Sequence, residues 1–229
     1  MHIHIPDGIL PVWLWGSGYL IAFIFLALAL VKMRKDVKRF PLIAALSALM
    51  LVVMSIPLGI PYHLNLAVLA GFILGPFYSI VSAFIVNLIL ASFGHGGITI
   101  VGLNTLVLWT ESMVGYYLFS ALREITKNLF LRAWISTFFA LMVSAFFVIF
   151  LVSISTLSPE IFLHEKLEGL KINLQTFMAL TLPIATLGAI LESFVTAFAI
   201  NYLKKVLSLI HISEPTRPLY ISYAVFCLK

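Results

Sequence analysis

The residues best suited to chemistry stand at the beginning of the chain, which reads MHIHIPDGILP. A free α-amine followed directly by His2 can chelate a divalent metal. The amine of Met1, the deprotonated amide of residue 2 and the His2 imidazole are joined by short covalent paths. Three nitrogens in a near-planar array suit Ni²⁺ or Cu²⁺, and Co²⁺ accepts the same donors. The terminus therefore predicts a metal site, which weakens as pH falls because imidazole binds metals in its neutral form.

A fourth nitrogen from elsewhere in the chain would complete the plane. His63 is the best-placed candidate, because it opens a short apolar segment. His95 lies in the turn GHGG, whose glycines let the backbone approach another segment closely. His164 stands in an acidic loop and is interpreted as a solvated surface residue. The alternative to a metal site is that these histidines only form hydrogen bonds at a membrane surface.

The composition assigns the chain to the membrane proteins. Hydrophobic residues make up 62% of it and charged residues only 10%, and the mean hydropathy is +1.12. Soluble domains carry roughly 45–50% apolar and about 25% charged residues. A globule this apolar could not cover its surface with polar groups, so its solvent is lipid.

A membrane-spanning helix needs about 20 apolar residues. We expect an all-α integral membrane protein, a bundle of about seven transmembrane helices. The candidate spans are residues 12–33, 41–56, 64–74, 77–92, 98–122, 133–155 and 174–203. The third is short, and Gly75-Pro76 ends it because proline disfavours helix at the preceding residue. A helix this short at membrane depth must be sheltered by its neighbours.

Basic residues indicate the orientation. With seven spans, ten of them fall on one side and only Lys166 and Lys171 on the other. The positive-inside bias then places the N-terminus and all five histidines before residue 207 outside, and the C-terminus in the cytoplasm. The net charge of +5 is thus a topology signal, and no nucleic-acid partner is expected. The ten basic residues are Lys32, Arg34, Lys35, Lys38, Arg39, Arg123, Lys127, Arg132, Lys204 and Lys205.

The domain organisation is expected to be one transmembrane substrate-binding domain, residues 1–206. Residues 207–229 change character and resemble the conceptual translation of a sequencing adapter, so we expect a non-native read-through tail. That tail holds Cys227, the single cysteine, so no thiol or disulfide chemistry is expected in the domain.

Among the polar residues within the apolar spans, four are candidates for a functional role. Glu111 and Glu192 are costly in lipid and are functional candidates by default. Each is either a protonated acid that is hydrogen-bonded between helices or part of an ion path. Asn87 and Asn104 are candidates to bridge helices or to orient metal ligands through hydrogen bonds. The sequence contains no phosphate loop of the type G-x-x-x-x-G-K-[ST], so the chain is not expected to be an ATPase or another enzyme.

Four stretches in the first half of the chain resemble the cobalt/nickel substrate-specific membrane component of energy-coupling-factor transporters, the CbiM/NikM family. They occur in the family's order, with matching spans between them. They are HIPDGILP at residues 4–11, HLNL…LGP at residues 63–76, GHGGIT at residues 94–99 and GLN at residues 102–104. The remainder, to about residue 205, agrees only in its hydrophobic layout.

The resemblance implies that the metal is held by Met1, His2 and His63, with His95 and Asn104 as candidates to support these ligands. The family reads M-H-I-P-D-G, whereas here two extra residues precede this pattern. Either Met1-His2 still chelates, or translation starts at Ile3 and His4 becomes the ligand at position two.

The resemblance also implies an uptake system for Co²⁺ or Ni²⁺ that is linked to cobalamin biosynthesis and resides in the cell membrane. No cofactor is expected, because the metal is the transported ion. The implied partners are an ATPase pair, a coupling transmembrane subunit and a small accessory membrane subunit. Alternatives are a vitamin-binding subunit of the same transporter class, a stand-alone divalent-cation channel and, with the least support, a membrane metalloenzyme.

Overall fold

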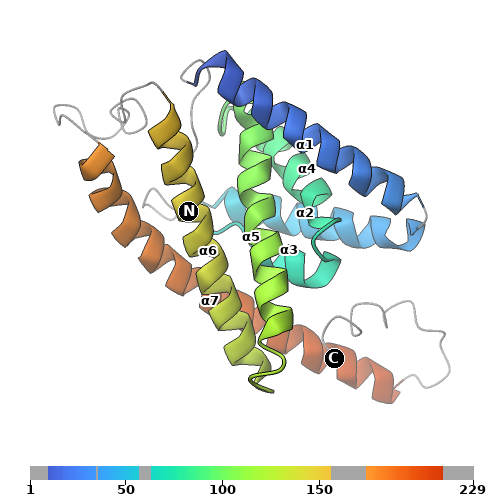
Figure 1. Ribbon diagram of the computed structural model, residues 1–229. Coiled ribbons are helices and arrows are strands. Elements are labelled where there is room, and N and C mark those ends of the chain that lie inside the picture. Colours follow the sequence, from blue (N-terminus) through green and yellow to red (C-terminus); the bar gives the residue numbers. More distant parts are fainter. Residues whose placement is uncertain (1–9, 35, 57–62, 156–173, 214–229) are drawn as a thin grey trace.

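The computed structural model describes residues 10–34, 36–56, 63–155 and 174–213. These residues form seven α-helices, in agreement with the seven predicted elements, and two short 3₁₀ helices (Figure 1). In chain order they are α1 (Val12–Met33), η1 (Val37–Arg39), α2 (Phe40–Met54), α3 (Ala67–Leu74), α4 (Ser79–Ser92), η2 (Ile98–Ile100), α5 (Val101–Ala121), α6 (Leu129–Ile154) and α7 (Leu174–Ser213).

Five of the described helical stretches are long and apolar enough to cross a membrane. They are Val12–Met33, Val37–Met54, Ile98–Ala121, Leu129–Ile154 and Phe177–Val206. Large apolar side chains on their outer faces are exposed, including Leu20, Phe146 and Phe198. Lipid is the solvent that tolerates such a surface. The protein is therefore a multi-pass membrane protein, as its composition predicts.

The short third helix is sheltered by protein, as expected. Helix α3 has only eight residues, and all of them except Ile73 are buried. It contacts α2, α4, α5 and α7, so it lies inside the bundle (Figure 1). Its end is the predicted one: Gly75 has a φ of 79°, a left-handed conformation that glycine adopts without strain, and Pro76 follows.

The starts of α3 and α6 differ from the sequence prediction for identifiable reasons. Helix α3 begins at Ala67 rather than at residue 64, because residues 63–66 are not helical. Helix α6 begins at Leu129 rather than at residue 133, because the Asn128 side chain caps it by accepting a hydrogen bond from the Leu131 amide at 3.2 Å.

The early start of α6 corrects the placement of Arg132, which was expected in the loop before this span. Arg132 lies in the first turn of α6 and is buried. Its guanidinium group donates a hydrogen bond to the Phe119 carbonyl oxygen at 2.8 Å and lies 4.2 Å from the centroid of the Phe119 ring. A hydrogen bond and a cation–π contact thus replace the water that a loop arginine would have.

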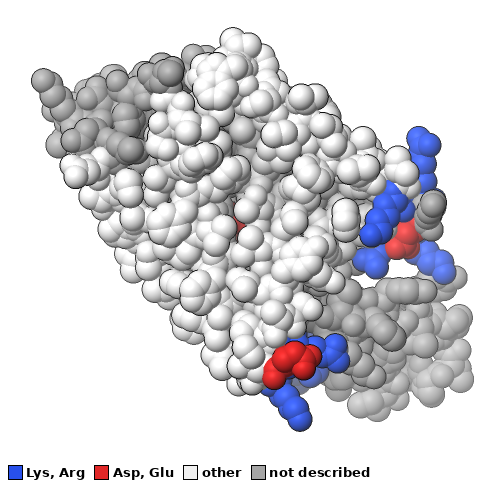
Figure 2. All heavy atoms as spheres, viewed as in Figure 1, with Lys and Arg blue, Asp and Glu red and all other residues white. Residues whose placement is uncertain are grey.

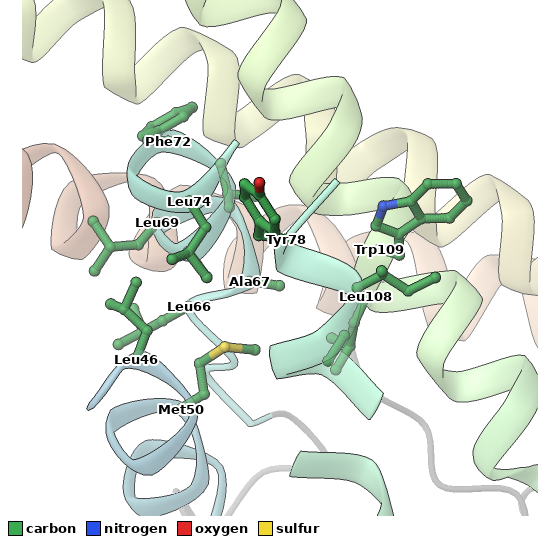
Figure 3. Packing of buried hydrophobic residues seen from close by; sticks show 14 of the residues in the cluster. Leu46, Met50, Leu66, Ala67, Leu69, Phe72, Leu74, Tyr78, Leu108 and Trp109 are labelled. Atoms are coloured by element: carbon green, nitrogen blue, oxygen red, sulfur yellow. The ribbon is translucent and has the colours of Figure 1, made fainter. Parts of the chain in front are cut away.

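The main core surrounds α3. Side chains from α2, α3 and α5, together with Tyr78 just before α4, meet in one cluster (Figure 3). Trp109 makes two contacts that fix its position. Its indole N–H donates to the Pro76 carbonyl oxygen at 2.6 Å, and its ring centroid lies 4.5 Å from that of Phe25. The residues labelled in this cluster are Leu46, Met50, Leu66, Ala67, Leu69, Phe72, Leu74, Tyr78, Leu108 and Trp109.

Helices α3 and α5 approach each other backbone to backbone. A Cβ atom at Gly71 would come within 2.8 Å of the Ser112 Cα atom. The Ser112 hydroxyl group donates across the same contact to the Ala67 carbonyl oxygen at 2.8 Å. Small residues allow such close contacts between membrane helices, where packing is a main source of association energy.

Charged side chains gather at the ends of the helices and leave an apolar surface between them (Figure 2). One group lies at the connection of α1 and α2 and contains the Arg39–Asp36 ion pair, with 2.7 Å between Nε and Oδ2. A second group lies at the connection of α5 and α6. Lys35, Lys166 and Lys171 from the orientation argument are outside the described residues, so the predicted orientation stays a prediction.

The close contact at Gly71 generates a stability prediction. Gly71→Ala should lower the free energy of unfolding by about 1–3 kcal/mol, because backbone atoms of Ser112 cannot move aside as a flexible side chain would. SDS-induced unfolding of the purified protein measures this change. Gly16→Ala is the matched control, since a Cβ atom there meets nothing within 4 Å. Equal stability of the two variants would contradict the close α3–α5 packing.

Candidate metal site

His63 stands at the head of the non-helical segment that leads into α3. It is half-buried, whereas Asn65 and Leu66, which follow it, are buried. The sequence analysis placed His63 at the opening of this span, and the structure confirms that position. Its imidazole therefore lies where the buried helix of the bundle begins.

His95 comes to the same place from a different part of the chain. It occupies the turn after α4, between Gly94 with a φ of 77° and Gly96 with a φ of 87°. The ring centroids of His63 and His95 are 5.3 Å apart, in an edge-to-face arrangement with an interplanar angle of 75°. The glycines permit the tight turn, and the result is a pair of imidazoles from segments 32 residues apart.

The other predicted ligands are not placed. Met1, His2 and His4 lie outside the described residues. Within the described residues, no group of three or more His, Cys, Asp and Glu side chains is arranged to hold a metal ion. Asn104 is buried in the first turn of α5, and its role in supporting the ligands stays a prediction.

A buried polar cluster, which we define as Asn65, Glu111, Ser144 and Glu192, begins two residues after His63 in the chain. All four residues are fully buried. The Asn65 side-chain amide donates to Glu111 at 2.7 Å, and the Ser144 hydroxyl group donates to the same carboxyl group at 2.6 Å. Glu111 thus joins the segment before α3 to α5 and α6.

Glu192 completes the cluster from α7. Its carboxylate oxygens accept hydrogen bonds from the backbone amide of Leu66 at 3.0 Å and from that of Asn65 at 3.4 Å. Both intramembrane acids are therefore hydrogen-bonded to other segments of the bundle, as one of the two alternatives expected, and their protonation stays a prediction.

The sequence analysis quoted Asn65 only as part of a motif and gave it no role. It connects the cluster, because its side-chain amide donates to Glu111 and its backbone amide donates to Glu192. Its side-chain oxygen also accepts from the Ala67 amide at 2.8 Å. One signal was present, because asparagine is favoured immediately before a helix, where its side chain can accept from a free amide. Its link to Glu111, 46 residues away, carried no signal in one sequence.

Comparison with known families bears on what the site binds. The family model described as "Cobalt uptake substrate-specific transmembrane region" matches residues 4–209. The chain belongs to the CbiM family. The match covers nearly all of the described residues, including the histidine pair and the polar cluster, so the chain is a membrane transport component.

Individual members of the CbiM family are distant relatives. The cobalt transport protein CbiM of Listeria seeligeri is 30% identical over 215 residues, which cover 89% of this chain and 84% of that protein. The cobalt transport protein CbiM of Geobacter sulfurreducens is 26% identical over 145 residues, 58% of this chain. The match covers only 42% of the Geobacter protein, so this chain spans less than half of that relative's length.

Solved structures show the same fold. A transition metal transporter superposes with a TM-score of 0.76 at 24% identity, covering 94% of this chain and all of the other. A truncated transition metal transporter gives a TM-score of 0.73 at 23% identity, covering 88% of this chain and 98% of the other. This CbiM family chain therefore has the fold of those transporters.

The polar cluster generates a second stability prediction. Ser144→Ala should lower the free energy of unfolding by about 1–2 kcal/mol, because Glu111 loses a donor in a place that water does not reach. Ser136→Ala is the control on the same helix. That serine is also fully buried, but its hydroxyl group donates to the Arg132 carbonyl oxygen within α6. Equal losses in SDS-induced unfolding would contradict a role for the interhelical bond.

Proposed function

We propose that this CbiM family protein is the metal-capturing membrane subunit of an energy-coupling-factor importer and that Co²⁺ or Ni²⁺ is its substrate. The observation that carries the proposal is the half-buried His63, held beside His95 at the head of a helix inside the bundle. An imidazole ligand suits the borderline-soft divalent ions of the late first transition row. The family description, cobalt uptake, supports the same substrate class.

The remaining ligands in this proposal come from the start of the chain. The amine of Met1, the amide nitrogen of His2 and its imidazole supply three donors, and His63 supplies the fourth. If translation starts at Ile3, His4 takes the position of His2. His95 then acts as the neighbour whose edge-to-face contact restrains the His63 ring. A restrained ligand loses less entropy when the ion binds.

The energy for transport comes from partners in this proposal. The sequence holds no phosphate loop, so ATP hydrolysis belongs to a separate ATPase pair. A coupling membrane subunit and a small accessory subunit complete the assembly. The positive-inside bias supports capture of the ion outside and its release into the cytoplasm. Basic residues at the α1–α2 and α5–α6 connections, such as Lys38 and Lys127, would then face the cytoplasm.

Blocking the α-amine should abolish tight metal binding, because one of the four nitrogen donors and the adjacent chelate ring are lost. We expect Ni²⁺ titration calorimetry of the full chain to show binding with a free amine and none at micromolar concentration after Nα-acetylation. A short N-terminal extension should abolish binding in the same way as acetylation. The same extension placed at the C-terminus is the control. A chain that starts at residue 3, with Ile3→Met as initiator, identifies whether His2 or His4 supplies the ligand. Unchanged Ni²⁺ and Co²⁺ binding by the acetylated protein would refute the proposed site.

The two histidines should differ in the size of their effects. Loss of a residue that only supports a ligand costs about 10–100-fold in metal affinity, so loss of a ligand should exceed that range. We therefore expect His63→Ala to weaken Ni²⁺ binding by more than about 100-fold and His95→Ala by about 10-fold. Calorimetry and cellular Co²⁺ uptake with the complete transporter measure both. Uptake that persists in His63→Ala without an ATPase would instead support a stand-alone channel.

A further inference from the structure

The step from Asn65 to Leu66 is held by helices that are distant in the sequence. Glu192 on α7 accepts from both backbone amides of this step, and Glu111 on α5 accepts from the Asn65 side chain. Leu66 and Asn65 lie 126 and 127 positions before Glu192 in the sequence. Two carboxyl groups on different helices thus bind one dipeptide of the chain.

This dipeptide is the one that needs such support. Leu66 has a φ of 55°, in the left-handed region, which costs a residue with a side chain roughly 1–2 kcal/mol. The amides of Asn65 and Leu66 precede α3 and have no carbonyl partner within that helix. Because hydrocarbon offers no hydrogen bonds, an acceptor for these amides must come from the protein. Glu192 is that acceptor.

The position of this dipeptide determines the position of His63. Only Leu64 lies between His63 and Asn65, and consecutive Cα atoms are about 3.8 Å apart, so a rotation at Asn65 or Leu66 displaces the imidazole directly. Helix α7 contains the carboxylate and reaches from Leu174 to Ser213, with Pro183 nine residues before Glu192. A shift of α7 along or about its axis would therefore be transmitted to the histidine.

We propose that Glu192 is a positioning residue for His63: through the amides of Asn65 and Leu66, α7 sets where the metal-ligating imidazole stands. This inference rests on the proposed function in its use of His63 as a ligand. It adds that the strength of metal binding depends on α7, a helix that contributes no metal ligand within the described residues. Displacement of α7 by a partner would then loosen the metal without any contact to it.

Two substitutions of nearly the same volume separate acceptance of hydrogen bonds from packing. Glu192→Gln keeps one of the two oxygens that accept from the Leu66 and Asn65 amides, whereas Glu192→Met fills the same space without an acceptor. Ser193→Ala is the control on the adjacent position of α7, because its hydroxyl group donates only to the Ala189 carbonyl oxygen of the same helix at 2.6 Å. Gel filtration and SDS-induced unfolding show which variants fold.

The first measurement needs no metal. Exchange of the His63 imidazole Cε1 hydrogen with deuterium, followed by mass spectrometry of the full-length protein, reports the surroundings of that ring. We expect Glu192→Met to lose the protection of His63, Glu192→Gln to lose part of it because one accepting oxygen remains, and Ser193→Ala to retain it. If a folded Glu192→Met protein keeps wild-type exchange at His63, the inference is overturned whatever the protein transports.

The second measurement uses Ni²⁺ alone. We expect the Ni²⁺ dissociation rate of Glu192→Met to rise by about tenfold or more, because the Asn65 and Leu66 amides lose their acceptor, and its visible absorption band to move toward that of His63→Ala. Glu192→Gln should give values between those of wild type and Glu192→Met, because one of the two accepting oxygens remains. A shift in His63→Ala without one in Glu192→Met refutes the inference and leaves the proposed function intact. A wild-type band in His63→Ala refutes the proposed function, and the exchange measurement then still tests the positioning role.

Discussion

The hydrogen bonds that Glu111 and Glu192 make to the segment ahead of α3 are the constraint on which the rest of the structure depends. A break in helical structure at membrane depth exposes backbone amides, and hydrocarbon cannot satisfy them. Here the break in helical structure is required, because it contains His63 and leads into α3. Glu192 accepts from the backbone at 3.0 and 3.4 Å, and Glu111 accepts from Asn65 at 2.7 Å. The two acids, which look costly in the sequence, therefore permit the irregular segment that presents the candidate ligand.

The burial of α3 follows from the same requirement. Eight residues at 1.5 Å each give a helix of about 12 Å, far too short to span a bilayer, so its two ends lie among other helices. Gly71 brings its backbone against that of Ser112, and the Ser112 hydroxyl group fixes the register by donating to Ala67. Rigid support from α5 on one side and α7 at its start gives His63 a defined position. A metal ligand needs such definition, since a mobile imidazole binds more weakly.

The functional interpretation combines this geometry with the family. The CbiM family assignment covers residues 4–209, and solved transition metal transporters share the fold with TM-scores of 0.76 and 0.73. The structure brings together His63 and His95, two of the residues that the sequence analysis selected. Met1, His2 and His4, on which the chelate hypothesis depends, lie outside the described residues. The nitrogen chelate at the terminus therefore still rests on the chemistry of the MHIH sequence and on the resemblance.

The sequence by itself determined the class of protein, the number of helices and the shelter of the third one. These properties follow from the hydropathy of each segment and from Gly75-Pro76, which ends the third helix, and both can be read from neighbouring residues in the sequence. Only the tertiary structure decided that Asn65 connects two buried acids, that Arg132 of α6 stacks on Phe119 of α5 and that His95 packs against His63. These are contacts between different helices or the turns between them, the longest over 127 residues. One sequence has no periodic signal for such contacts, because they depend on how helices pack and not on which residues form a helix.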